Sequence, residues 1–117
     1  LERPEKIQRI AERSQAVLDN LIVCWKYPDR NCGQCLKCIR TMIIFRILGV
    51  DSDSFTSSIS AEYVSKLSPS QDYRAYFEDL LRFAIEQGDE PMEHALRKSL
   101  SVSTTKKIIK LIATYVV

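Results

Sequence analysis

Residues 24–40, CWKYPDRNCGQCLKCIR, contain every cysteine of this 117-residue chain: Cys24, Cys32, Cys35 and Cys38. Four thiolates this close in sequence can converge on one metal ion, and zinc binds four cysteine ligands as a tetrahedron. Gly33 can adopt the positive φ that a turn around a metal often needs. Because Cys35 and Cys38 are three residues apart, a helix that starts here places both on one face of its first turn. The stretch therefore predicts a four-cysteine metal site.

The spacing of the cysteines leaves one strong alternative to zinc. Disulfides are typical of secreted chains, and no apolar leader with a cleavage site is recognisable in this sequence. A thioredoxin-like redox pair would use two cysteines and leave two unexplained. An iron–sulfur cluster is also held by four thiolates, so it stays open as the second assignment. Since four cysteines leave no position for water, we expect a zinc ion here to be structural.

The composition indicates a globular domain with a sizeable core, because 45% of the residues are hydrophobic and 27% are charged. The net charge of +2 is too small to favour nucleic acid as a partner. No apolar run approaches the ~20 residues that span a membrane. We therefore expect a cytoplasmic protein that binds no membrane, for which a homo-oligomer is possible. A first residue other than Met suggests a segment of a longer protein.

Hydrophobic residues recur with helical periodicity along nearly the whole chain, which predicts a mainly α-helical fold. One amphipathic helix is expected over residues 5–21. A second, apolar on most of its faces, is expected over 35–48 with Gly49 as its C-cap. Residues 21–25 are expected to form either a short strand or an extended lead into the metal loop. Together these elements make a first block, residues 1–50, which is a zinc-binding module.

A serine-rich connection, residues 51–58, leads to a helical block of residues 59–117, and the two blocks are expected to form one compact domain. Ser60 is expected to cap a short helix. A longer helix is expected to end at Gly88, with Pro91 at the first position of the next helix.

Four further expectations concern single residues of this helical block and of the metal loop. Ser103 or Thr104 is expected to cap a last helix. His94 is expected to be solvated, and Trp25 is expected to shield the metal. The aromatic residues spaced as on one helix face are expected in the core: Tyr73, Tyr76, Phe77 and Phe83.

The metal block resembles a known family. The pattern Asn-Cys-Gly-x-Cys-x-Lys-Cys-x-Arg-Thr-Met, residues 31–42, preceded by Cys24, is similar to the zinc-binding C-terminal region of PP-loop ATP-dependent enzymes related to the cyano-deazaguanine synthases of queuosine biosynthesis. The segment Arg-Pro-Glu-Lys-Ile, residues 3–7, also resembles the part of those enzymes that precedes the motif and places a lysine-bearing helix near the nucleotide. The resemblance covers residues 3–50.

This resemblance implies that the chain is an accessory domain of an adenylating enzyme, with no activity alone. PP-loop enzymes hold the phosphates of ATP in a Ser-Gly-Gly-x-Asp-Ser loop, and the three glycines of this chain lie in no such loop. ATP and Mg²⁺ would then bind only through a missing upstream nucleotide-binding domain, which would be the partner of this one. The alternative is a non-catalytic, zinc-stabilised interaction module that binds protein or RNA.

Three residues are candidates for a functional role beyond metal binding. Arg40 and Thr41 follow the last cysteine on a helix whose remaining faces are apolar, although Arg40 could serve only to neutralise thiolate charge. Lys6 is a candidate through the resemblance alone.

Overall fold

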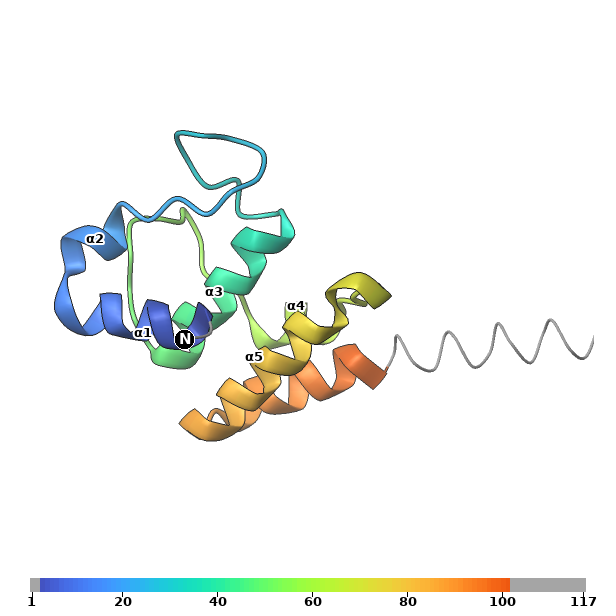
Figure 1. The fold of residues 1–117 in the computed structure, drawn as a ribbon. Helices are drawn as coiled ribbons and strands as arrows, with labels where there is room; N and C mark the ends of the chain where they lie inside the picture. Colours follow the sequence, from blue (N-terminus) through green and yellow to red (C-terminus); the bar gives the residue numbers. More distant parts are fainter. Residues whose placement is uncertain (1–2, 102–117) are drawn as a thin grey trace, which may run out of the picture. The chain divides into compact units, whose positions relative to one another are not determined.

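The computed structural model describes residues 3–101, and this part of the chain contains helices and no strand (Figure 1). The expected mainly helical fold is therefore confirmed. Contacts divide the chain into two compact units, residues 1–59 and residues 60–117. The expectation that the second block packs on the first stays a prediction. Within the described residues, no helix combines the length and the apolar character that a membrane span needs.

The first unit is built around α3, Leu36–Leu48, on which α1, Arg3–Arg13, packs. The short helix α2, Gln15–Asp19, contacts α1. Ile7 of α1 and Leu18 of α2 are buried, and α3 contributes most of the remaining core. Its buried residues are Cys38, Ile39, Thr41, Met42, Ile43, Ile44, Phe45 and Ile47. A helix buried on so many sides needs to be apolar around most of its circumference, as the sequence predicts.

The prediction of one continuous helix over residues 5–21 was wrong. The chain leaves helical geometry at Ser14, where φ is −156° and ψ is 106°, and α2 begins after it. The Ser14 hydroxyl accepts a hydrogen bond from the backbone N–H of Val17 at 3.2 Å. Serine is among the preferred N-cap residues because its side chain satisfies a free N–H of the first turn. The hydrophobic pattern continues across this cap, so periodicity alone cannot reveal the break.

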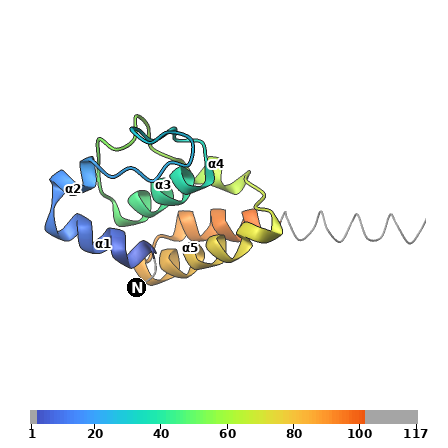
Figure 2. The ribbon, with the colours of Figure 1, turned by 45° about the horizontal axis from the view of Figure 1, so that its top comes forward.

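Residues 51–58 return along the start of the metal loop after α3 ends at Gly49 (Figure 2). Gly49 has φ 67° and caps α3 in the left-handed conformation, which confirms the expected C-cap. The ring of Phe55 meets that of Phe45 edge to face, with centroids 5.6 Å apart. The Ser52 hydroxyl donates to the carbonyl of Leu18 at 2.9 Å. Side-chain contacts therefore attach this segment to α2 and α3, whereas the sequence predicted only a serine-rich connection.

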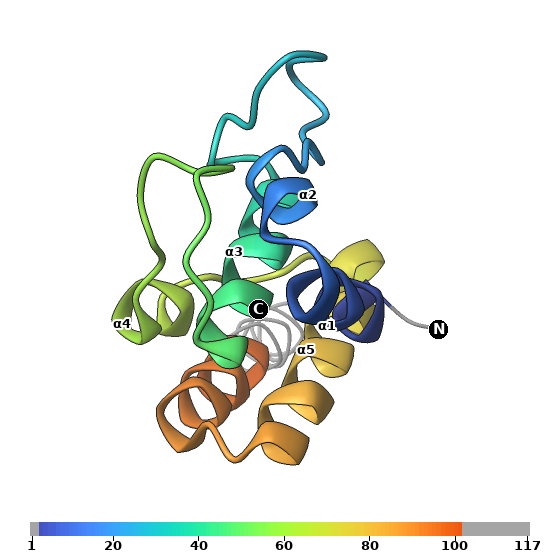
Figure 3. The same cartoon turned by 90° about the vertical axis from the view of Figure 1, so that its left-hand side faces the viewer.

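The second unit contains α4, Ala61–Ser65, the 3-10 turn η1, Gln71–Tyr73, α5, Arg74–Gln87, and a helix that starts at residue 90 and is described to residue 101. Helix α5 and the helix from residue 90 lie side by side (Figure 3). Their buried side chains form the core of this unit: Phe77, Leu80, Phe83, Ala84, Met92, Ala95, Leu96 and Leu100. The Ser99 hydroxyl ties the second of these helices to the carbonyl of Leu67 at 2.8 Å.

The caps of the second unit were predicted with one error. Ser60 accepts from the N–H of Tyr63 at 3.0 Å, and Gly88 ends α5 at φ 75°, so both expected caps are confirmed. Pro91 is not the first residue of the next helix, because that helix already begins at Glu90. Asp89 caps it by accepting from the N–H of Met92 at 3.1 Å. The sequence analysis placed the start of the helix at the proline and did not identify the aspartate two positions before it as the N-cap.

The aromatic residues of this unit are only in part in the core. Phe77 and Phe83 are buried as expected, whereas Tyr76 is exposed, so its assignment to the core was wrong. Tyr73 is half-buried. The expected last helix, capped by Ser103 or Thr104, lies outside the described residues.

Candidate metal centre

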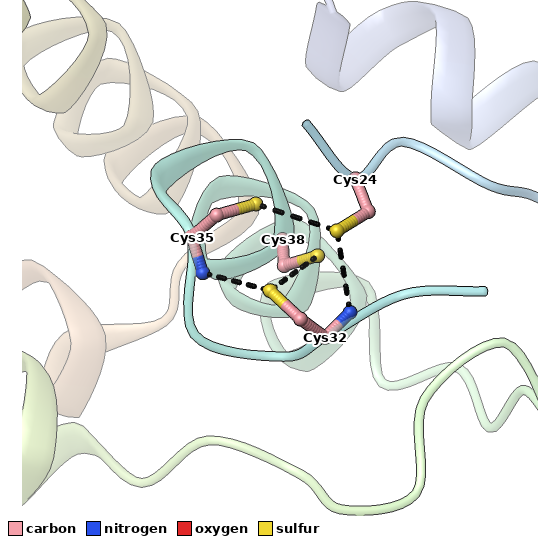
Figure 4. A group of neighbouring side chains, drawn as sticks. All are labelled: Cys24, Cys32, Cys35 and Cys38. Atoms are coloured by element: carbon pink, nitrogen blue, oxygen red, sulfur yellow. Dashed lines mark hydrogen bonds between the residues drawn. The ribbon is translucent and has the colours of Figure 1, made fainter. Parts of the chain in front are cut away.

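The sulfurs of Cys24, Cys32, Cys35 and Cys38 point toward one another at the start of α3 (Figure 4). All four lie within 4.8 Å of one another. The sulfurs of Cys24 and Cys35 are 3.9 Å apart, and those of Cys32 and Cys38 are 4.0 Å apart. Four sulfurs bound at about 2.3 Å to one tetrahedral ion would be separated by about 3.8 Å. The cluster can therefore hold a single metal ion with little rearrangement.

Two of the four cysteines are positioned by α3 and two by the loop before it. Cys35 is the N-cap of α3, and Cys38 lies in its first turn with no exposed surface. Cys24 follows a segment without regular secondary structure, so the short strand considered for residues 21–25 does not form. This combination joins a helical pair of ligands to a pair held by irregular backbone.

Gly33 makes the turn between the two halves of the cluster. Its φ is 75°, a left-handed conformation that L-residues with a side chain rarely adopt, so the expected positive φ is confirmed. No heavy atom lies within 4 Å of the position that a Cβ would take. The glycine is therefore needed for the backbone conformation and not for a close approach.

Backbone N–H groups surround the sulfurs. The amides of Lys26 and Cys32 point at the sulfur of Cys24, at 3.2 and 3.4 Å, and those of Gln34 and Cys35 point at the sulfur of Cys32, at 3.4 and 3.2 Å. Donors aimed at a sulfur favour the thiolate over the thiol. The loop thus offers fixed partial positive charges to a cluster that becomes anionic when it binds a metal.

These surroundings make the four thiols unequal. Burial raises the pKa of the Cys24 thiol, but the backbone amides of Cys32, Tyr27 and Lys26 outweigh it and lower the pKa to about 6. Burial raises the pKa of the Cys38 thiol to about 12, and the neighbouring thiols of Cys35 and Cys24 add to the rise. The thiolate is therefore favoured at Cys24, whereas Cys38 keeps its proton until a cation displaces it.

Asn31 supports the cluster from the residue before Cys32, and the sequence reading missed this role. Its Oδ1 accepts from the N–H of Val23 at 2.8 Å, and its Nδ2 donates to the carbonyls of Leu21 and Ser54 at 2.8 and 2.9 Å. These partners fix which end of the amide is oxygen. Asn31 is part of the motif quoted for the resemblance, and an amide next to a ligand was the available signal.

The other predicted site residues do not join the cluster. Thr41 is fully buried, and its hydroxyl donates to the carbonyl of Lys37 at 2.9 Å, so it belongs to the core. Arg40 is half-buried two residues after Cys38 on α3, and Lys6 is exposed on α1, a helix without cysteines. His94 is exposed, as expected. Trp25 exposes 55% of its surface to solvent, and its expected role in shielding the metal stays a prediction.

The first unit also contains a cavity of about 560 Å³ between α2, the end of α3 and residues 51–59. Some of its polar side chains already have partners within the protein. The Gln15 amide donates to the carboxylate of Asp19 at 2.8 Å, and the Arg46 guanidinium donates to the backbone carbonyl of Ile59 at 3.2 Å. Four thiols that converge on one point are the more specific ligand set, so the cysteine cluster is the stronger candidate site.

Comparison of the chain with protein-family models, with curated proteins and with solved structures finds no match. What the molecule does must therefore be inferred from its own residues.

Proposed function

We propose that the four cysteines bind one Zn²⁺ ion that stabilises the fold. The observation that carries this proposal is the spacing of the sulfurs, which is close to that of four ligands on a single tetrahedral ion. In a four-iron cluster each thiolate binds a different iron atom, so its sulfurs would need to lie farther apart. The donor set has no open position for water, which favours a structural over a catalytic ion.

The chain would then act as the zinc-binding accessory domain of a PP-loop ATP-dependent enzyme. Support comes from the residues around the ligands: Asn31, Gly33 and Cys35 have local roles in the cluster that explain this part of the motif. The adenylating chemistry would belong to a nucleotide-binding domain outside this sequence. Because cysteines stay reduced in the cytoplasm, we place the protein in that compartment.

Two measurements test these statements separately. Elemental analysis of the purified chain should find about one equivalent of zinc and a colourless protein. A brown protein that contains iron and absorbs near about 400 nm would contradict the zinc assignment. Calorimetric titration with Mg·ATP should show no binding to the 117-residue chain and binding to the longer polypeptide that includes the upstream domain. An upstream sequence without a Ser-Gly-Gly-x-Asp-Ser loop would overturn the enzyme assignment and leave the zinc assignment intact.

A zinc-stabilised interaction module is the second candidate function. The observation that favours it is the large exposed side chain of Trp25 next to a proposed ligand. A tryptophan ring left open to water beside a rigid metal site is typical of a residue that contacts a partner.

A further inference from the structure

The segment that carries the cysteines also carries two aromatic rings and three cations. Trp25 and Tyr27 lie between the first and second cysteines together with Lys26 and Arg30, and Lys37 lies between the third and fourth. Trp25 and the side chains of Lys26 and Arg30 are exposed, whereas Tyr27 and Lys37 are half-buried. We call these five residues the aromatic–basic surface.

Each ring of this surface has a cation beside it. The guanidinium of Arg30 lies 3.9 Å from the ring centroid of Tyr27, and the ammonium of Lys26 lies 5.6 Å from the same centroid. The ammonium of Lys37 lies 5.3 Å from the ring centroid of Trp25. Such contacts hold each cation next to its ring. Each ring and its cation therefore present a planar face and a positive charge together.

The three cations of this surface contact aromatic rings. Basic residues near the cysteines can also offset the charge of the thiolates. The sulfurs, however, receive hydrogen bonds from backbone amides, and the contacts of Lys26, Lys37 and Arg30 are to aromatic rings and, for Arg30, also to Asp29 at 3.6 Å. Since Zn²⁺ with four thiolates carries a formal charge of about −2, the surface has no net surplus of positive charge; what it offers an anionic partner is three cations held beside aromatic rings.

We propose that the aromatic–basic surface binds single-stranded nucleic acid, with bases stacked on Trp25 and Tyr27 and phosphates at Lys26, Arg30 and Lys37. Aromatic platforms combined with cations are the general means by which proteins hold unpaired strands. The guanidinium plane of Arg30 adds a further face on which a base can stack. This inference departs from our sequence-based expectation, which judged nucleic acid by the net charge of the whole chain.

The shape of the surface favours an extended strand over a single nucleotide. A mononucleotide is usually bound in a concave pocket, and the cavity of this unit lies against residues 51–59 and includes none of the five residues. A strand can instead cross an open loop and use several weak contacts. A duplex would fit poorly, because its bases are stacked on one another and hide their faces.

Binding should depend on the metal, because the metal loop holds the platform in place. Trp25 directly follows the proposed ligand Cys24, and Lys37 lies between two proposed ligands on the first turn of α3. The proposal thus rests on the metal site, although it does not need a PP-loop parent protein. Confirming one bound metal before each titration keeps a failure of the metal assignment distinct from a failure of this inference.

Trp25 is the only tryptophan of the chain, so its fluorescence reports on the surface directly. The metal-loaded 117-residue chain is titrated at low salt with oligouridylate and oligothymidylate of about 12 nucleotides, a length within the usual site size. We expect saturable quenching with either strand, weaker binding as salt rises, and loss of binding after chelation. A difference between the two strands would report recognition of the 2′-hydroxyl. A self-complementary duplex should bind much more weakly.

Substitutions separate stacking from charge, with binding followed by the anisotropy of a labelled strand. Trp25→Ala should weaken binding roughly 5- to 150-fold, whereas Trp25→Phe, which keeps a ring, should recover much of the loss. Lys37→Ala should reduce the slope of log K against log salt by about 0.7. Lys98→Ala, an exposed cation of the second unit, is the matched control and should change neither quantity.

Several results would overturn the inference. These are no quenching by either strand, equal affinity for the duplex, or binding by Trp25→Ala equal to that of the unaltered chain. Quenching by an acidic peptide or by phosphatidylserine vesicles but not by oligonucleotides would replace the partner with a protein or a membrane. Should Trp25→Ala lose its metal, Tyr27→Ala and Lys37→Glu carry the same test: Tyr27→Ala must weaken binding and Lys37→Glu must abolish it while metal is retained.

Discussion

The side-chain amide of Asn31 donates a hydrogen bond to the backbone carbonyl of Ser54, 23 residues further along the chain, at 2.9 Å. The same amide group bonds Leu21 and Val23 in the lead to the metal loop. One side chain therefore joins three segments that no regular secondary structure connects. A buried polar group without a hydrogen-bond partner lowers the free energy of unfolding. Loss of the Asn31 side chain should therefore destabilise the fold more than loss of an exposed side chain does.

Replacement of Asn31 by alanine should lower the free energy of unfolding by about 1–3 kcal/mol, because it leaves one N–H and two carbonyls without their partner. Urea unfolding of the metal-loaded protein measures this. Gln34→Ala, an exposed side chain of the same loop, is the control and should change stability by less than about 0.5 kcal/mol. Equal effects of the two substitutions would show that Asn31 does not support the loop.

Cys38→Ser should abolish stoichiometric metal binding and cost roughly 3–5 kcal/mol of stability or more, since metal binding and folding are coupled. Cys38 is fully buried, so its loss also disturbs the core around α3. Metal content and melting temperature are measured together. Ser57→Ala, on the exposed part of residues 51–58, should leave both unchanged. A Cys38→Ser protein with normal metal content would remove Cys38 from the ligand set.

The carboxylate of Asp19 should stabilise the first unit in a pH-dependent way. Its pKa is lowered below the ordinary 3.8 by hydrogen bonds from the Gln15 side chain and, next, from the N–H of Asp53. A lowered pKa contributes stability that is present above the unfolded value and is lost as the pH falls through the folded value. The stability advantage of the native chain over Asp19→Asn should therefore shrink between about pH 5 and about pH 3.

Denaturant unfolding of both proteins at each pH measures this difference, and the subtraction cancels effects of acid on the metal site that the two share. Gln15→Ala should raise the pKa of Asp19 and reduce the pH dependence. A difference between the two proteins that is constant with pH would argue against the role of the charge.

Asp89→Ala should destabilise the second unit by about 1 kcal/mol, because the N–H of Met92 loses its cap. Asp89→Ser keeps an oxygen that can accept the same hydrogen bond and should cost much less. Thermal unfolding followed by circular dichroism compares the variants with Gln87→Ala, an exposed residue at the end of α5. If serine and alanine at position 89 are equally destabilising, the cap is not the cause.

The features that the sequence predicted well are those in which one residue type has one dominant use. Glycine after an apolar helical run predicted the ends of α3 and α5 at Gly49 and Gly88. Clustered cysteines with short spacing predicted that four sulfurs would meet. The strongly apolar stretch after Cys35 predicted a buried helix. Each of these inferences depends on local chemistry that tertiary structure has little freedom to change.

The features that were missed depend on polar side chains with several possible uses. Ser14 and Asp89 cap helices, yet serine and aspartate are also common on helix surfaces and in turns, and the apolar pattern runs past Ser14 without interruption. The contacts of Asn31 involve a residue 23 positions away, which no local pattern contains. The exposure of Tyr76 was misjudged because aromatic residues spaced on one helix face are usually buried.

At Gly33 the handedness of an amino acid, and not the size of its side chain, decides whether it fits the backbone. Space for a methyl group is free at this residue, but the backbone lies in the region that L-amino acids disfavour and their mirror images prefer. Chemical synthesis of the loop with D-alanine at position 33 should therefore leave the turn intact and, by restricting the unfolded chain, make it easier to form, whereas L-alanine at the same position should strain it. At this residue the fold selects a mirror-image conformation, and glycine is the one genetically encoded residue that adopts it without a penalty.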